Sequence, residues 1–208
     1  MSQYLYFLIA CSIFSVIFGF KNQSVLAKIT ACFFSLLLLV ELVCSRVSIT
    51  DGIYNFWYPV EFGFYCWFLY RYMQTAFRHY LLTLPILAML YCYSYYFSHW
   101  QTVTLFYTFG YGIFVTILFV FVIIKIYELL TDENDLRFPF KIPLFWFLLG
   151  LILNLSSFLL FGMKNYILSH NRNLYVIMQY SNQILSSIQY LCFIIYFYCS
   201  YKFQNWNL

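Results

Sequence analysis

Long apolar runs separated by short polar breaks make up most of this sequence. Each run is close to the ~20-residue length of a helix that crosses a bilayer. Because hydrocarbon offers no hydrogen-bond partners, a spanning backbone must satisfy itself, and runs of this length favour helices over the strands of a barrel. The pattern predicts an all-α, polytopic transmembrane helical bundle with seven spans, at residues 4–20, 24–45, 56–73, 80–98, 102–127, 142–163 and 173–201.

Two of the seven spans are weaker predictions than the others. The run at 4–20 is short, but it has no basic n-region and no A-x-A site, so we interpret it as a span and not as a signal peptide. The run at 80–98 contains Pro85 and several Tyr and Ser, which suits a tilted or interfacial helix. Five or six crossings are the alternative. Pro59 and Pro143 are expected in the first turns of the third and sixth spans, where a missing backbone donor costs least.

Basic residues in the polar breaks predict the orientation of the chain. Successive breaks lie on alternate sides of the membrane, and cytoplasmic loops carry an excess of Lys and Arg. Eight basic residues then fall on one side and three on the other, which places the amino terminus outside and the carboxyl terminus in the cytoplasm. The larger group is Lys21, Lys28, Arg71, Arg78, Lys125, Arg137, Lys141 and Lys202, and the smaller is Arg46, Lys164 and Arg172.

Composition indicates a membrane protein packed by large side chains. The 208 residues are 64% hydrophobic and 9% charged, whereas soluble domains carry roughly 25% charged residues. The 26 Phe and 22 Tyr far outnumber the 7 Gly, although small residues are what let membrane helices approach closely. No stretch between the runs is long enough to fold alone, so we predict one transmembrane domain over residues 1–208. The formal charge of +4 follows from membrane orientation, and no nucleic-acid partner is expected.

The sequence contains no pattern typical of catalysis or of a bound metal. Its seven cysteines form no C-x-x-C pair, and its histidines form no H-x-x-x-H or E-x-x-H motif. A Ser–His–Asp set, a phosphate-binding glycine loop and paired intramembrane aspartates are also absent. The last span lacks the lysine that a retinal Schiff base needs. We therefore expect a protein that is not an enzyme and carries no cofactor or metal.

An ionisable side chain inside a span is costly and is therefore a functional candidate. Glu61, about one turn into the third predicted span, is the strongest candidate, and Glu41 lies nearer the outer end of the second. Contact with a ligand or an ion is one interpretation of Glu61. The other is a carboxylate that bonds to a neighbouring helix or reaches the headgroups.

A band of polar residues interrupts the last span: Gln179, Ser181, Asn182, Gln183, Ser186, Ser187 and Gln189. Spacings of three and four place Gln179, Asn182 and Gln183 on one helix face that points into the bundle. Asn154 of the sixth span lies at comparable depth, so we expect a seam of hydrogen bonds between spans six and seven. The seam is either structural or the lining of a ligand or ion cavity. If the helices form a ring, Glu61 converges on that cavity with these amides.

The longest predicted cytoplasmic connection carries an acidic cluster followed by basic and aromatic residues. A solvated loop is the simpler interpretation of this stretch, TDENDLRFPFK. The functional interpretation is a binding surface for a separate cytoplasmic protein, formed by Asp132, Glu133, Asp135 and Arg137.

Three segments carry a resemblance: FWYPVEFGFYCWFLY (56–70), PLFWFLLGLILNLSSFLLFG (143–162) and LYVIMQYSNQILSSIQYLCFIIYFYC (174–199). They resemble small, aromatic-rich multipass proteins of Bacteroidetes-type bacteria, whose layout is similar to bacterial seven-helix sensor modules. The resemblance implies the inner (cytoplasmic) membrane and a sensory or regulatory role. Because this sequence departs from those sensor modules in having no output domain, we expect it to act through a separate cytoplasmic partner. An oligomeric pore or carrier is the alternative. Small accessory membrane proteins of phage-defence systems have a similar size and composition.

Overall fold

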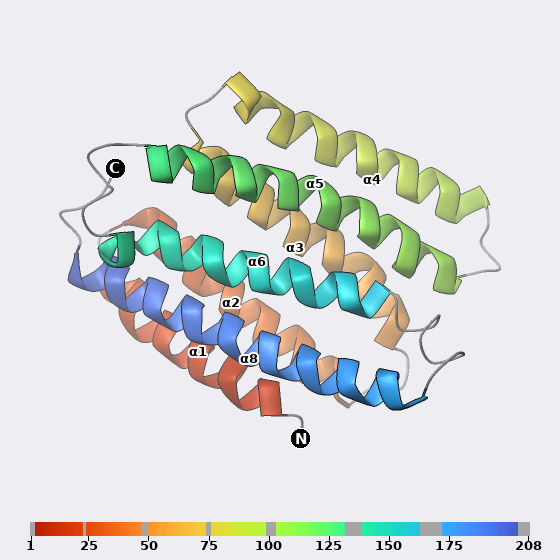
Figure 1. The fold of residues 1–208 in the computed structure, drawn as a ribbon, viewed down its shortest axis with the longest axis horizontal. Helices are drawn as coiled ribbons and strands as arrows, with labels where there is room; N and C mark the ends of the chain where they lie inside the picture. The colour runs from red at the N-terminus through yellow and green to blue at the C-terminus, as the bar shows by residue number, and fades with distance from the viewer. Residues whose placement is uncertain are drawn as a thin grey trace. The chain divides into compact units, whose positions relative to one another are not determined.

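The described part of the computed structural model is built of α-helices (Figure 1). The structure describes residues 3–22, 24–46, 50–73, 76–98, 103–131, 139–162 and 172–203. Within these ranges it contains seven α-helices, two short 3₁₀ helices and no strand. The α-helices are α1 (Gln3–Lys21), α2 (Val25–Cys44), α3 (Thr50–Tyr72), α4 (Tyr80–Ser98), α5 (Val103–Thr131), α6 (Pro143–Gly162) and α8 (Arg172–Lys202), and the 3₁₀ helices are η1 (Ala76–His79) and η2 (Pro139–Lys141).

The prediction of an all-α fold is confirmed, and each predicted run is a helix. Five helices agree with the predicted runs to within one residue at both ends. The exceptions are α3, which begins at Thr50 instead of residue 56, and α5, which ends at Thr131 instead of residue 127. Polar residues at these two ends predicted loops, but a polar turn can extend a helix beyond its apolar part.

The early start of α3 makes the prediction for Pro59 wrong. Pro59 lies inside α3, not in its first turn, and Glu61 lies near the middle of the helix. Pro143 is the first residue of α6, so the prediction for this proline is correct.

Three helices in the described part of the chain are long and apolar enough to cross a membrane: Val25–Cys44, Gly112–Thr131 and Asn173–Lys202. Leu5–Lys21 and Pro143–Ser157 are shorter apolar helices. Large apolar side chains are exposed along these helices, for example Leu36 and Leu39 of α2, as suits a surface covered by lipid. Membrane association is thus supported, while the seven-span count and the orientation stay predictions.

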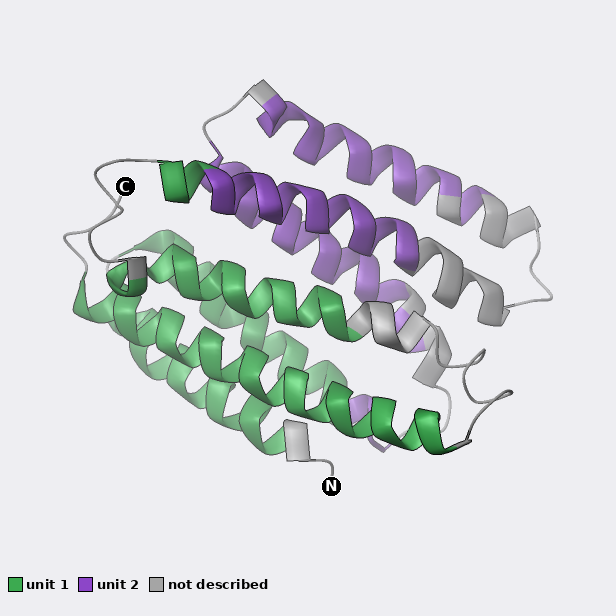
Figure 2. Cartoon of the chain, viewed as in Figure 1, with its two compact units in different colours: residues 1–42, 128–208 green, residues 43–127 purple. Residues whose placement is uncertain are grey.

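The chain divides into two compact units (Figure 2). Unit 1 comprises Met1–Leu42 and Glu128–Leu208, which include α1, most of α2, α6 and α8. Unit 2 comprises Val43–Tyr127, which includes α3, α4 and most of α5. The single-domain interpretation stays a prediction.

Aromatic side chains form the core of unit 1. The ring of Phe34 on α2 lies 4.7 Å from that of Phe193 and 5.6 Å from that of Phe197, both on α8. The ring of Phe147 on α6 lies 5.4 Å from that of Phe193. All four side chains are fully buried. The expectation that large aromatic residues pack this bundle is confirmed for unit 1.

Two glycines of unit 1 lie where a side chain would collide with a neighbouring helix. A Cβ atom added at Gly19 of α1 would lie 2.6 Å from the Cβ of Ala31 and 3.1 Å from the carbonyl oxygen of Ala27, both on α2. A Cβ added at Gly150 of α6 would lie 2.9 Å from the ring of Phe193. Small residues at these two points let the helix backbones approach while aromatic rings fill the rest of the core.

Unit 2 is held by contacts of α3 with its neighbours. Phe62 of α3 stacks on Phe114 of α5 with ring centroids 4.5 Å apart. Near the end of α3 that leads to α4, the guanidinium of Arg78 lies 4.2 Å from the ring centre of Tyr70, a geometry that favours a cation–π interaction.

Candidate functional site

Helices α6 and α8 lie side by side in unit 1 (Figure 1). Two contacts define their register. Ser157 pairs with Asn182, and Gly150 lies against the Gln189 carbonyl and the Phe193 ring. Residue numbers rise along α6 as they fall along α8, so the two helices are antiparallel.

Polar side chains occupy this apolar interface. The Ser157 hydroxyl donates a hydrogen bond to the side-chain oxygen of Asn182. Asn154 precedes Ser157 by one turn on α6 and is buried, and Gln189 of α8 is buried at the level of Gly150. We call Asn154, Ser157, Asn182 and Gln189 the polar seam. The structure shows one hydrogen bond between these two helices, from Ser157 to Asn182, and the wider seam of bonds stays a prediction.

The two other predicted amides of α8 are less buried. Gln179 is exposed, and its Nε2 donates to the hydroxyl of Tyr175 on the same helix at 2.7 Å. Gln183 is half-buried. Met178, four residues before Asn182, is buried instead. The inner face of α8 is therefore rotated from the predicted face, because an apolar side chain and not Gln179 fills the turn before Asn182.

Gln189 belongs to the polar band of the last predicted span, but it is not among the site residues predicted from the sequence. Only 3% of its surface is exposed, which makes it more buried than any of the three amides chosen on this helix. It follows Asn182 by seven residues, or about two helical turns, so both side chains share a face. That spacing is the feature of the sequence that indicates Gln189 as a residue of the buried face.

Glu61 is buried in unit 2. The hydroxyl of Tyr65, one turn later on α3, donates to Glu61 Oε1 at 3.2 Å. This bond lies within α3, so both interpretations of Glu61, a bond to a neighbouring helix or the headgroups and contact with a ligand or an ion, stay predictions. Glu61 belongs to unit 2 and the polar seam to unit 1, so their convergence on one cavity stays a prediction. Glu41 is half-buried on α2.

A second hydrogen-bonded group joins α8 to the beginning of α2. The buried hydroxyl of Tyr196 bonds to the side chains of Thr30 and Ser200. The Asn22 Nδ2 donates to the Ser200 carbonyl at 2.8 Å, and the Asn22 Oδ1 accepts the backbone N–H of Ser24 at 2.8 Å. These bonds fix the connection between α1 and α2 against the last turns of α8.

The predicted partner-binding residues Asp132, Glu133, Asp135 and Arg137 lie outside the described residues. In the part of the chain that the structure describes, no group of three or more His, Cys, Asp or Glu side chains is arranged to hold a metal ion. The candidate site is therefore built on amides and hydroxyls.

Scans of family models, of curated proteins and of solved structures each found no match to this chain. The resemblance to aromatic-rich multipass proteins of Bacteroidetes-type bacteria stays a prediction.

Proposed function

We propose that this chain is a multipass protein of the bacterial inner membrane that acts as a non-enzymatic sensory or regulatory subunit through a separate cytoplasmic partner. In this proposal all seven α-helices span the membrane, with the amino terminus outside and the carboxyl terminus in the cytoplasm. The observation that carries the proposal is the polar seam between α6 and α8.

The polar seam supports two alternative helix packings. In lipid, an amide that leaves one partner must find another, because hydrocarbon supplies none. The Ser157–Asn182 bond is one pairing, and the side chains of Asn154 and Gln189 provide further donors and acceptors along the same interface. Hydrogen bonds between membrane helices contribute roughly 1 kcal/mol each. A ligand with modest differential affinity for the two packings would therefore shift the balance between them.

Both helices of the seam lead to the surface where a cytoplasmic partner is proposed to bind. Helix α6 begins just after the predicted partner loop, and α8 leads into the carboxyl terminus. If α6 slid against α8, the predicted partner loop and the carboxyl terminus would both change position. This supplies a route from the polar seam to a soluble protein without catalysis.

The first test is affinity purification of the tagged protein from native membranes in mild detergent, with lysine crosslinking and mass spectrometry. We expect a soluble signalling or effector protein crosslinked at the exposed Lys141, whereas Lys125 is buried and is not expected to react. Asn182→Leu removes the seam bond and is expected to change that crosslink yield severalfold. Gln179→Leu, on the exposed side of the same helix, is the matched control. Recovery of copies of this chain alone would contradict the regulatory role.

A second candidate is an oligomeric pore or carrier, and the exposure of Gln179 favours it. A polar side chain exposed on a membrane-capable helix is costly in lipid unless another chain covers it. This function predicts a homo-oligomer and a planar-bilayer conductance that Gln179→Leu alters. The same arrangement would suit an accessory protein of a phage-defence system. An unchanged oligomeric state and the absence of conductance would exclude the pore.

A further inference from the structure

Four lysines gather at one end of unit 1. Lys21 is the last residue of α1, Lys28 lies in the first turn of α2, Lys141 ends η2 just before α6, and Lys202 is the last residue of α8. Lys21, Lys141 and Lys202 are exposed, and Lys28 is half-buried.

Packing within unit 1 brings these helix ends together. The Phe18 ring on α1 lies 5.9 Å from that of Tyr198 and 5.5 Å from that of Tyr201, so the ends of α1 and α8 are neighbours. Because α6 is antiparallel to α8, its beginning lies at this end, with the Phe147 ring 5.3 Å from that of Tyr196. The bond from Asn22 to the Ser200 carbonyl fixes the α1–α2 connection there.

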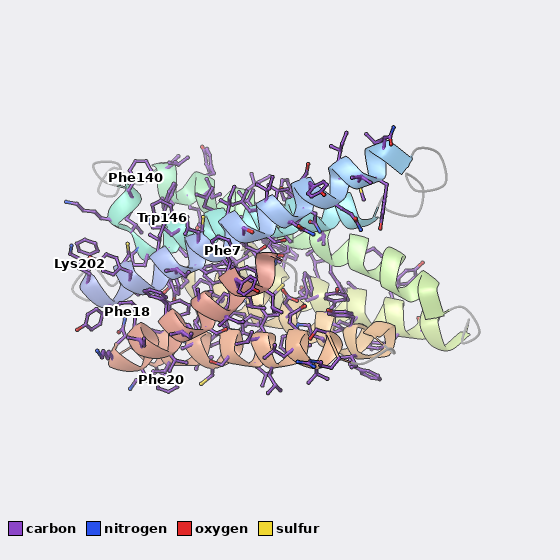
Figure 3. All side chains as sticks on the ribbon, turned by 90° about the horizontal axis from the view of Figure 1, so that it is seen from below. Phe7, Phe18, Phe20, Phe140, Trp146 and Lys202 are labelled. Carbon is purple, nitrogen blue, oxygen red and sulfur yellow. The ribbon has the colours of Figure 1, made fainter. Side chains whose placement is uncertain are left out.

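An ordered aromatic cluster lies beside Lys141. The rings of Phe140, Phe145 and Trp146 have centroids 5.5 to 6.2 Å apart, and the indole N–H of Trp146 donates to the Phe140 carbonyl at 2.8 Å. The Phe140 side chain is nevertheless 66% exposed. In Figure 3, Phe140, Trp146 and Lys202 lie toward the same end of the unit. An exposed ring with a fixed indole next to a lysine is typical of the membrane–water interface.

The carboxylates of the described residues do not neutralise this end, and Asp132, Glu133 and Asp135, which precede Lys141 in the sequence, lie outside the described residues. The described acidic residues of unit 1 are Glu41 and Glu128. Glu41 lies in the last turn of α2, at the opposite end from Lys28, and Glu128 lies in the last turn of α5. Even with Glu128 counted at this end, the four lysines leave a net positive charge among the described residues.

We propose that this end of unit 1 binds the phosphodiester headgroups of anionic phospholipids such as phosphatidylglycerol. Lys141 and Lys202 contact the phosphate, Lys21 adds to the positive field, and Phe140 and Trp146 pack against the glycerol and upper acyl region. The apolar outer faces of the same helices bring the acyl chains to this position. The inference is independent of the regulatory proposal, because it needs only a membrane-embedded unit 1.

The test uses the full-length protein in a zwitterionic detergent. Native mass spectrometry measures binding of phosphatidylglycerol and of phosphatidylcholine. We expect phosphatidylglycerol to bind more tightly, with a loss of roughly fivefold for Lys141→Gln or Lys202→Gln and roughly 25-fold for the double variant. Arg46→Gln, which removes an exposed positive charge at the other end of α2, is the matched control and is expected to bind as wild type.

Separate control experiments test whether the variants fold and which ligand the site binds. The double variant without lipid is expected to keep the wild-type thermal midpoint, and Lys→Arg at both positions is expected to restore binding. The proposal is overturned if the double glutamine variant binds phosphatidylglycerol as wild type does, or if the two lipids bind alike. Full competition by millimolar inorganic phosphate would also overturn it, because the site would then belong to a soluble anion.

Discussion

The contact between α1 and α2 gives the sharpest prediction about the fold, and Gly19→Ala tests it. The new Cβ atom would lie 2.6 Å from the Cβ of Ala31 and 3.1 Å from the Ala27 carbonyl oxygen. Carbon atoms prefer separations of about 3.5 to 4.0 Å. Neither neighbour can rotate away, since one is attached directly to the backbone and the other belongs to it. The helices must therefore separate by roughly 1 Å at this point.

The expected loss of unfolding free energy follows from that separation of the helices. A gap of roughly 0.5 to 1 Å forfeits a quarter to a half of the dispersion attraction of the atoms involved, and overpacked sites in proteins cost about 1 to 3 kcal/mol. Alanine favours a helix over glycine by about 1 kcal/mol in water, but membrane helices persist in the unfolded reference state, so little of that gain applies. We expect the free energy of unfolding to fall by about 1 to 3 kcal/mol.

Unfolding in mixed micelles with a rising fraction of dodecyl sulfate, followed by tryptophan fluorescence, measures this change. Gly63→Ala on α3 is the matched control, because a Cβ atom there meets nothing within 4 Å. We expect Gly63→Ala to be neutral or slightly stabilising. Equal unfolding free energies for the two variants would refute the close approach of α1 and α2.

Three further predictions concern hydrogen bonds and topology. A double-mutant cycle with Ser157→Ala and Asn182→Leu is expected to give a coupling of about 0.6 to 1.7 kcal/mol in the same unfolding assay, and a coupling of zero would show that the bond contributes nothing. Tyr196→Phe removes a buried hydroxyl bonded to two side chains, so we expect a loss of about 1 kcal/mol; an unchanged unfolding midpoint would argue against those bonds. In a cysteine-free background, an impermeant maleimide added outside intact cells is expected to label Arg46→Cys but not Lys21→Cys, and the reverse pattern would invert the topology.

Helix positions were largely predictable from the sequence, because a long apolar run has only one well-satisfied backbone conformation in hydrocarbon. The errors arose where that rule does not apply. The stretch from Thr50 to Asn55 has a single aliphatic residue, Ile53, so hydropathy gave no helix there, yet the backbone continues the helix of α3 into this stretch. A polar helix end and a polar loop have similar compositions, and only the backbone distinguishes them.

The pairing of α6 with α8 was predictable, but the face that α8 presents was not fully so. Polar residues at matching depth in the two spans predicted that α6 and α8 pack against each other. The predicted face included Gln179, whereas Met178 is the buried residue at that turn. One residue corresponds to 100° of helix rotation, and an interface that mixes polar and apolar side chains does not fix the rotation from one sequence. Gln189, two turns from Asn182, restores the correct face once it is included.

The aromatic core and the polar seam of unit 1 have complementary roles. Helix association in lipid gains little from the hydrophobic effect, because the tails are as apolar as phenylalanine, so the Phe34, Phe147 and Phe193 cluster contributes mainly dispersion contacts. Aromatic rings can often repack after a helix slides. A hydrogen bond such as Ser157–Asn182 cannot follow that slide without loss. The polar seam therefore sets the register of α6 on α8, and a molecule that offers its amides new partners would act on the interaction that defines that register.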